Sequence, residues 1–150
     1  MSLKAKLRED LTASIRAKDE LRSGTLRMVL TAITNEEVSG KEARVLTDAE
    51  IITVLTREAK KRREAAEAFD QGGASDRADR ERAEGALIAG YLPAQLTEDE
   101  LNSLIKEAIE ATGANGPSGM GSVMKYLQPK VAGKADGATV SGAVKAALAK

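Results

Sequence analysis

Apolar residues recur every three or four positions through nearly the whole chain, and this spacing restricts the possible folds more than any other feature. The first run is the clearest, because Leu3, Leu7, Leu11 and Ile15 follow one another at intervals of four. Such intervals place side chains on one face of an α-helix, whereas a half-buried strand requires strict alternation. No segment of the sequence has that alternating pattern. The sequence therefore predicts an all-α fold.

Short polar residues and glycines mark where the predicted helices begin and end. Thr47 with Glu50, and Thr97 with Glu100, have the spacing of a capping box, in which each side chain accepts a hydrogen bond from the other residue's backbone amide. The other predicted helix starts are at Ser2, Asp19, Ser75 and Asp136, and the predicted stops are at Gly40, Gly72-Gly73 and Gly113. These signals predict two helical hairpins followed by three shorter helices.

Pro93 separates the hairpins from the shorter helices. Proline cannot donate a backbone hydrogen bond and disfavours helical geometry at the residue before it, so we expect it to break the fourth helix. We therefore predict an N-terminal helical domain over residues 1–92, a linker over 93–96 and a three-helix C-terminal domain over 97–150.

The composition excludes several kinds of active site. The chain has 150 residues and contains neither histidine nor cysteine, which supply most general bases, thiolate nucleophiles and zinc ligands. This argues against self-contained catalysis, and we expect no cofactor and no metal. Because there is no disulfide and no long apolar run, we also expect no membrane partner and a cytoplasmic location. The few aromatic residues, Phe69, Tyr91 and Tyr126, predict a core of aliphatic and alanine side chains.

The last third of the chain is cationic although the whole chain is neutral. From Asn115 onward, Asp136 is the single acid against the five lysines Lys125, Lys130, Lys134, Lys145 and Lys150. Gly119 and Gly121 precede a predicted helix, whose first amides can bind an anion. The predicted polyanion-binding residues are Gly119, Gly121, Lys125, Lys130, Lys134 and Lys145.

The same segment admits other interpretations. Gly121, Gly137 and Gly142 could instead permit close helix contacts, with the lysines merely solvated. Spacing alone favours this second interpretation, because a glycine pair is far less specific than a complete phosphate-binding loop. Ser122 and Lys125 also match the Ser-x-x-Lys pattern of some acyl-transfer enzymes, but the companion elements of that site are missing.

A second basic run, from Arg57 to Glu64, could offer a helical face to an RNA backbone. Its charges alternate in sign at intervals of four, as between Glu58 and Arg62 or between Lys60 and Glu64. That pattern is typical of ion pairs along an exposed helix, and we favour this interpretation.

A set of short motifs is distributed over essentially the whole chain. Its residues are Met1-Ser-Leu-Lys, Thr25-Leu-Arg27, Asn35, Lys61-Arg-Arg-Glu64, Phe69, Tyr91-Leu-Pro93, Gln95-Leu96, Gly119-Met-Gly121, Val123-Met124, Gly133-Lys-Ala-Asp-Gly137, Val140 and Leu148. Together these motifs resemble the YqeY family, whose members are stand-alone relatives of the tail domain of GatB, a subunit of the glutaminyl- and asparaginyl-tRNA amidotransferase. The set from Gly119 onward is shared in outline with the GatB tail.

The resemblance implies an elongated N-terminal part made of helical hairpins and a small three-helix C-terminal domain like the GatB tail. It also implies an association with carbon–nitrogen ligase activity that uses glutamine as amide donor. In the amidotransferase, catalysis belongs to a separate amidase subunit and to the kinase domain of GatB, and the tail is associated with holding tRNA. We therefore expect an accessory module that binds tRNA or a tRNA-modifying or aminoacylating enzyme. The alternative is a protein-interaction module that docks through the third and fourth helices and has no nucleic-acid role.

Overall fold

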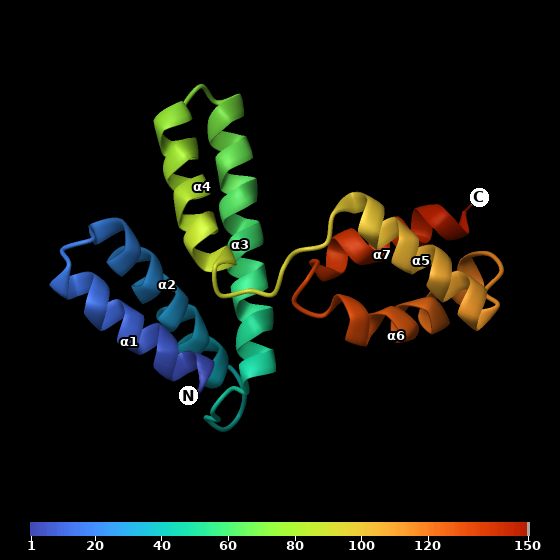
Figure 1. Cartoon of the computed structure of the whole chain (residues 1–150), viewed down its shortest axis with the longest axis horizontal. Coiled ribbons are helices and arrows are strands. Elements are labelled where there is room, and N and C mark those ends of the chain that lie inside the picture. The colour runs from blue at the N-terminus through green and yellow to red at the C-terminus, as the bar shows by residue number, and fades with distance from the viewer. Residues whose placement is uncertain (150) are drawn as a thin grey trace. The chain divides into compact units, whose positions relative to one another are not determined.

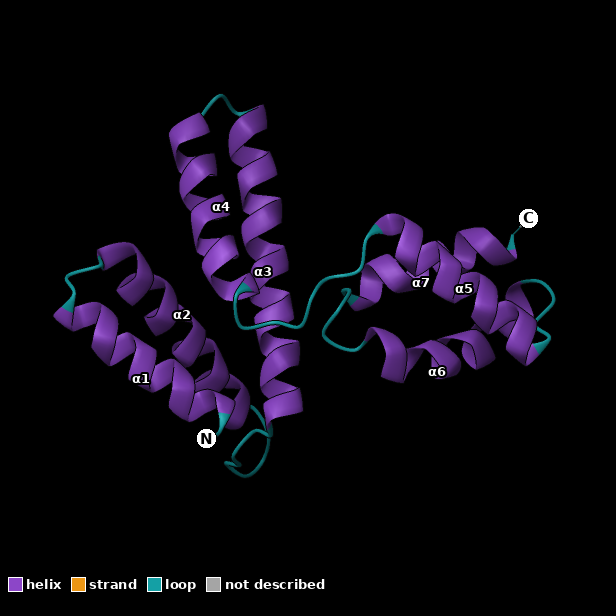
Figure 2. Ribbon diagram, viewed as in Figure 1, coloured by secondary structure: helices purple, strands orange, loops and turns teal. Residues whose placement is uncertain are grey.

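The computed structural model describes residues 1–149, and all regular structure within this range is helical, as Figure 2 shows. The predicted all-α fold is confirmed. In chain order the helices are α1 (Leu3–Arg16), α2 (Glu20–Glu37), α3 (Asp48–Gln71), α4 (Ser75–Ala89), α5 (Glu98–Thr112), the short 3₁₀ helix η1 (Pro117–Gly119), α6 (Met120–Val131) and α7 (Gly137–Leu148), labelled in Figure 1. The chain divides into two compact units, Met1–Leu92 and Pro93–Lys150.

Most of the predicted helix starts are formed by the expected side chains. Thr47 with Glu50 and Thr97 with Glu100 both make complete capping boxes. Ser2, Asp19 and Asp136 also cap their helices, each accepting a hydrogen bond from a backbone amide of the first turn. At these five positions the helix begins where the capping residue in the sequence predicts.

The predicted cap at Ser75 is wrong, because the N-cap of α4 is Ala74 and it makes no side-chain bond. The reason lies in the preceding turn. Gly73 adopts a positive φ of 76°, and the Ala74 amide donates to the Phe69 carbonyl at 2.8 Å. Ala74 thus closes α3 and opens α4 at once, which leaves Ser75 inside the helix.

The predicted stop of the second helix at Gly40 is also displaced, because α2 ends at Glu37. The loop that follows folds back onto this residue. The Arg44 amide donates to the Glu37 carbonyl at 3.0 Å, and the Leu46 amide donates to Glu37 Oε2 at 3.1 Å. The first bond occupies the Glu37 carbonyl, which another helical turn would need as an acceptor, and the second holds the loop against the Glu37 side chain.

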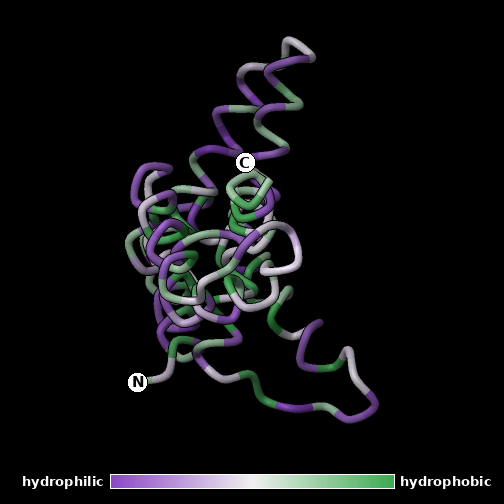
Figure 3. The backbone as a smooth tube through the Cα atoms, turned by 90° about the vertical axis from the view of Figure 1, so that its right-hand side faces the viewer, coloured by the Kyte–Doolittle hydropathy of each residue, from purple (hydrophilic) through white to green (hydrophobic). Residues whose placement is uncertain are grey.

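The N-terminal unit has one apolar core between two helical hairpins. It contains Leu7 of α1, Leu26, Val29 and Ile33 of α2, Leu46 of the loop, Ile51, Val54 and Leu55 of α3 and Ile88 of α4, all buried. The outer half of the α3–α4 hairpin extends beyond this core, and there Ala66 and Ala78 are the buried apolar residues. Its far end is coloured mainly as hydrophilic in Figure 3. Alanine contacts let the two helices approach closely without a third helix.

The C-terminal unit packs α5, α6 and α7 around a second aliphatic core. Its buried members are Leu101, Ile105, Ala108, Val123, Leu127, Val131, Val140, Val144 and Leu148. The segment 93–96, predicted as a linker, is bonded to this unit. The Leu96 amide donates to the Lys134 carbonyl at 2.9 Å, and Gln95 Nε2 donates to the Gly133 carbonyl at 2.8 Å. Both acceptors lie in the turn before α7, far along the chain, so no local feature of residues 93–96 indicates these contacts.

Candidate functional site

The start of α6 differs from the open amide cluster expected there, because η1 leads directly into it. The Gly119 amide donates to the Gly116 carbonyl at 3.0 Å, and the Met120 amide donates to the Pro117 carbonyl. A Cβ atom added at Gly119 would lie 2.6 Å from Ala114 Cβ. Close packing on Ala114 therefore accounts for glycine at position 119, and its amide is already bonded to Gly116, so its role in admitting an anion stays a prediction without structural support.

Gly121, by contrast, is exposed and faces open space. A Cβ atom added there would meet nothing within 4 Å, and the same is true of Gly137 and Gly142. The interpretation that these three glycines permit close helix contacts is therefore wrong. Of the two glycines predicted to admit an anion, Gly121 has an accessible backbone.

Three of the four predicted lysines are available to a ligand. Lys125 of α6, Lys134 in the turn before α7 and Lys145 in the last turn of α7 are exposed. None of them forms an ion pair with the residues that the structure describes. Gly121 and Lys125 are four residues apart on α6, so they share the outer face of that helix.

Lys130 is held by its own domain. Its ammonium lies 3.3 Å from Glu107 Oε2 and 4.9 Å from the centre of the Tyr126 ring. The bond to Glu107, followed by the contact with Tyr126, raises the pKa of Lys130. A phosphate would have to compete with Glu107 for this lysine, which makes Lys130 the poorest of the predicted contacts.

The excess of positive charge is confined to the part of this domain that follows α5, because the domain as a whole contains equal numbers of lysines and acids. Residues 93–150 contain six lysines, namely Lys106, Lys125, Lys130, Lys134, Lys145 and Lys150, and six acids, namely Glu98, Asp99, Glu100, Glu107, Glu110 and Asp136. The acids of α5 therefore balance the cationic segment identified in the sequence. Lys134 precedes α7 and Lys145 lies in its last turn, and this 12-residue helix spans about 18 Å. The available lysines thus suit an extended polyanion better than a single small one.

Ser122 and Lys125, the pair considered for acyl transfer, are both exposed on α6. They make no hydrogen bond with each other among the described contacts. A serine activated by a lysine requires such a bond, or one that forms in the substrate complex. The arrangement of this pair gives the acyl-transfer interpretation no support.

The basic run on α3 forms ion pairs, as predicted. Lys60 lies 3.9 Å from Glu64, Lys61 lies 3.4 Å from Glu58, and Arg57 reaches Glu36 of α2 at 3.1 Å. These contacts occupy the cations that an RNA backbone would need.

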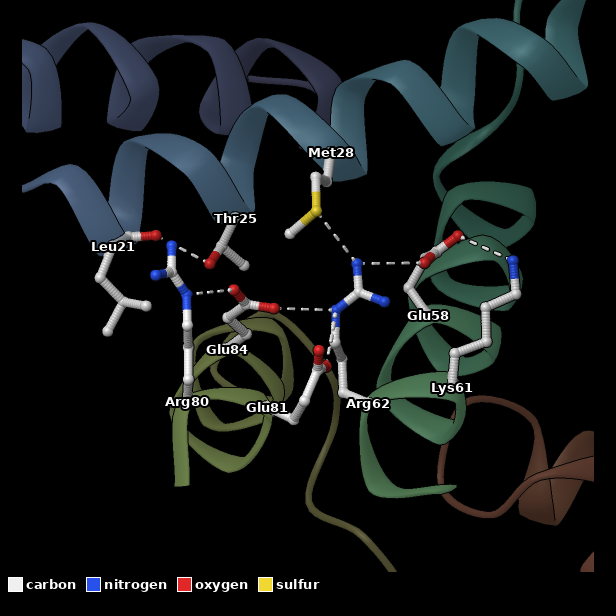
Figure 4. A network of polar contacts seen from close by, with 9 residues as sticks. All are labelled: Leu21, Thr25, Met28, Glu58, Lys61, Arg62, Arg80, Glu81 and Glu84. Atoms are coloured by element: carbon white, nitrogen blue, oxygen red, sulfur yellow. Dashed lines mark hydrogen bonds and ion pairs between the residues drawn. The ribbon is translucent and has the colours of Figure 1, made fainter. Parts of the chain in front are cut away.

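Arg62 departs from the prediction of an exposed helix, as Figure 4 shows. Its side chain is only 14 % exposed and points toward α4. Its guanidinium contacts three carboxylates, Glu58 at 3.6 Å, Glu81 at 3.7 Å and Glu84 at 3.2 Å, while its Nη2 lies 3.4 Å from Met28 Sδ of α2. The structure therefore places a buried ionic cluster, which we call the Arg62 cluster, where the three helices meet. One feature of the sequence agrees with this burial, because Arg62 lies three residues after Ala59 and four before Ala66, on the same helix face as these two alanines.

Neither a metal site nor a membrane span is present among the described residues. No group of three or more acidic side chains within residues 1–149 is arranged to hold a metal ion. In the same range, no helix combines the length and the apolar character needed to span a membrane. The Arg62 cluster and the available lysines remain as the main concentrations of charge.

Comparison with known proteins relates the chain to one family. A family model described as Yqey-like protein matches residues 4–148. The chain is also 28 % identical over 117 residues to a protein of Lachancea thermotolerans named "Altered inheritance of mitochondria protein 41, mitochondrial". That alignment covers 76 % of this chain and 62 % of the relative. The relative's name places that protein in mitochondria, and the cytoplasmic location of this chain stays a prediction. Because the family match spans nearly the entire sequence, the chain belongs to the YqeY family.

Proposed function

We propose that this protein is a non-catalytic accessory module that binds tRNA, alone or together with a tRNA-dependent enzyme of the amidotransferase type. The observation that carries the proposal is the set of three exposed lysines, Lys125, Lys134 and Lys145, which have no carboxylate partner among the described residues. Lysines of this kind bind phosphate without first breaking an ion pair. The chain resembles the GatB tail, which is associated with holding tRNA, and we therefore expect the bound polyanion to be tRNA.

The proposed contacts differ from those expected from the sequence. Gly121 and Lys125 offer an accessible backbone and an ammonium on one helix face, while Lys134 and Lys145 extend the surface along α7. Gly119 is excluded because it packs on Ala114, and Lys130 is at most a secondary contact because Glu107 holds it. Contacts to phosphate carry no base code, so binding is expected to depend little on tRNA sequence.

The ligase activity associated with the family is assigned to a partner enzyme in this proposal. The sequence contains neither histidine nor cysteine, and the Ser122–Lys125 pair is not bonded. The module would then position the tRNA, and the partner enzyme would catalyse the reaction. This division of work matches the one that the resemblance implies for the amidotransferase.

The decisive experiment is a tRNA titration at several salt concentrations. Three phosphate contacts predict that log affinity falls against log salt with a slope of roughly 2 to 3 in magnitude. The triple variant Lys125→Ala, Lys134→Ala, Lys145→Ala should reduce that slope to near zero. A matched variant, Arg16→Ala, Lys41→Ala, Lys106→Ala, also removes three exposed charges and should keep the slope. A salt-independent titration, or equal loss in both variants, would contradict the proposal.

The alternative of protein docking through α3 and α4 has less support. An unsatisfied charge on the helix face shared by Ala59 and Ala66 would favour docking, but Arg62 at this position is satisfied internally by Glu58, Glu81 and Glu84. A crosslinking pull-down from native lysate, read for both RNA and protein, separates the two functions. Loss of a protein partner after charge reversal at Arg57 and Arg63, with tRNA binding absent, would favour docking.

A further inference from the structure

Lys134 differs from the other two available lysines because it lies in a turn. Lys125 belongs to α6 and Lys145 to α7, whereas Lys134 lies between these two helices. A helix fixes the backbone of its lysines through its own hydrogen bonds. A lysine in a turn loses backbone freedom when it binds a ligand, unless other contacts already hold it, and this loss weakens binding. Contacts that hold the backbone at Lys134 are therefore expected to raise the affinity of this surface for a polyanion.

The backbone of Lys134 is held on both sides. Its amide donates to the Val131 carbonyl, at the end of α6, at 2.9 Å. Its carbonyl accepts a hydrogen bond from the Leu96 amide at 2.9 Å. Leu96 is partly buried and packs against the core of the C-terminal unit. The second bond therefore ties the turn to a segment that the core anchors, far from Lys134 in the sequence.

Gln95 adds a side-chain contact to the same turn. Its Nε2 donates to the Gly133 carbonyl at 2.8 Å and to the Pro93 carbonyl at 2.8 Å. A primary amide has two N–H groups, so these two bonds use both donors of the side chain. Gln95 is exposed, and its removal would leave no cavity in the core. Its side chain thus joins the segment before α5 to the residue that precedes Lys134.

We infer that Gln95 is a positioning residue for Lys134 in the binding of tRNA. By holding the Gly133 carbonyl, Gln95 restricts the turn before the ligand arrives. Less backbone freedom is then lost when Lys134 contacts a phosphate. Gln95 acts through the turn and contributes no charge to the surface. This inference rests on the proposed function and adds a residue that the charge pattern of the sequence does not indicate.

The inference predicts a specific pattern in tRNA titrations. Gln95→Ala is expected to weaken binding about threefold, which corresponds to the loss of one hydrogen bond of modest net strength. The salt slope should stay the same, because all three lysines remain. Lys134→Ala should instead lower the magnitude of the slope by about 1, as expected for one lost phosphate contact. In a Lys134→Ala background, Gln95→Ala should have little further effect, since the side chain that it positions is gone.

Amide hydrogen exchange tests the positioning without tRNA. The Leu96 amide donates to the turn and the Lys134 amide donates within it, so opening of the turn exposes both amides to solvent. Gln95→Ala is expected to speed their exchange in the full chain by about the factor that it costs in affinity. Gln128→Ala is the matched control, because Gln128 is also an exposed glutamine of the C-terminal unit and its side chain makes no hydrogen bond among the described contacts. The control should change neither the exchange nor the affinity.

Failure of this inference is distinguishable from failure of the proposed function. Absence of tRNA binding by the original protein would contradict the proposed function. Binding that Lys134→Ala weakens and Gln95→Ala leaves unchanged would overturn the role of Gln95 alone. An equal effect of Gln95→Ala with and without Lys134 would also overturn it, because a merely structural role does not depend on that lysine. Unchanged exchange of the Leu96 and Lys134 amides in Gln95→Ala would show that Gln95 does not hold the turn.

Discussion

Arg62 Nε lies 3.2 Å from Glu84 Oε2, joining α3 to α4 through two side chains that are 14 % and 9 % exposed. Glu84 also lies 3.4 Å from Arg80, and the same guanidinium of Arg62 reaches Glu58 and Glu81. One largely buried arginine thus neutralises carboxylates from two helices. The α3–α4 hairpin depends on this contact at the place where it leaves the apolar core.

Arg62→Met is therefore expected to destabilise the N-terminal unit by about 3 kcal/mol, because it leaves buried carboxylates without their cation. Urea unfolding monitored by circular dichroism measures the change. The double variant Arg62→Met, Glu84→Gln should lose less stability than the sum of the single variants, since the carboxylate left unpaired by the first change is neutralised by the second. Additive losses would show that the two side chains are not energetically coupled.

Lys18→Gly is expected to stabilise the α1–α2 hairpin by about 1 kcal/mol, because glycine adopts the left-handed conformation without a Cβ clash. The positive φ of 58° at Lys18 is the basis for this expectation. Lys18→Ala removes the same charge but keeps the clash, so it should change the melting temperature little. If both variants raise the melting temperature equally, the effect comes from the loss of the charge and not from relief of backbone strain.

The two glycines at the start of α6 are expected to respond in opposite directions. Gly119→Ala should cost about 1–3 kcal/mol, because the new Cβ overlaps Ala114, at 2.6 Å. Gly121→Ala meets open space and should stabilise α6 by up to about 1 kcal/mol. Thermal unfolding measures both effects, and Gly119→Ala with Ala114→Gly should recover much of the loss. Failure of that rescue would mean that contact with Ala114 is not the reason for glycine.

The contacts of Glu37 are expected to make the stability of the folded protein depend on pH. Its bond to Lys4 Nζ, at 2.6 Å, and its bond from the Leu46 amide lower its pKa below the ordinary 4.5. A carboxyl whose pKa is lower in the folded state contributes stability above its unfolded pKa and loses that contribution as the pH falls through the folded value. Glu37→Gln should therefore lower the melting temperature at pH 7. The difference from the original protein should vanish once the pH is well below 4.5. A difference that persists at such pH would point to packing and not to charge.

Local chemistry accounts for the parts of the fold that were predicted correctly. The capping boxes at Thr47 and Thr97, the Schellman glycine at Gly73 and the left-handed Gly113 act within a few residues, so their effect can be read from adjacent sequence. Helical periodicity similarly identified the core positions, such as Leu7 and Val144, that are buried. Both kinds of signal have short range.

Several positions were decided by contacts that the local sequence does not reveal. Gly119 was interpreted from its place at a helix start, whereas in the structure it packs on Ala114 and donates to the Gly116 carbonyl. The cationic segment was counted without Glu107 of α5, which pairs with Lys130. Gln95 and Leu96, in the segment predicted as a linker, donate hydrogen bonds to the carbonyls of Gly133 and Lys134. For Lys130 and for residues 95–96, the partners lie more than 20 residues away in the sequence, outside any short window.

The sequence alone determined that the chain is helical, where most of its helices begin and that it lacks the usual catalytic side chains, because propensity, capping and composition act locally. Tertiary structure decided which charges remain available. It buried Arg62 among Glu58, Glu81 and Glu84, paired Lys130 with Glu107, and left Lys125, Lys134 and Lys145 exposed. The physical reason is that Coulomb attraction and desolvation depend on distance in space, and packing brings together groups that sequence separates by tens of residues.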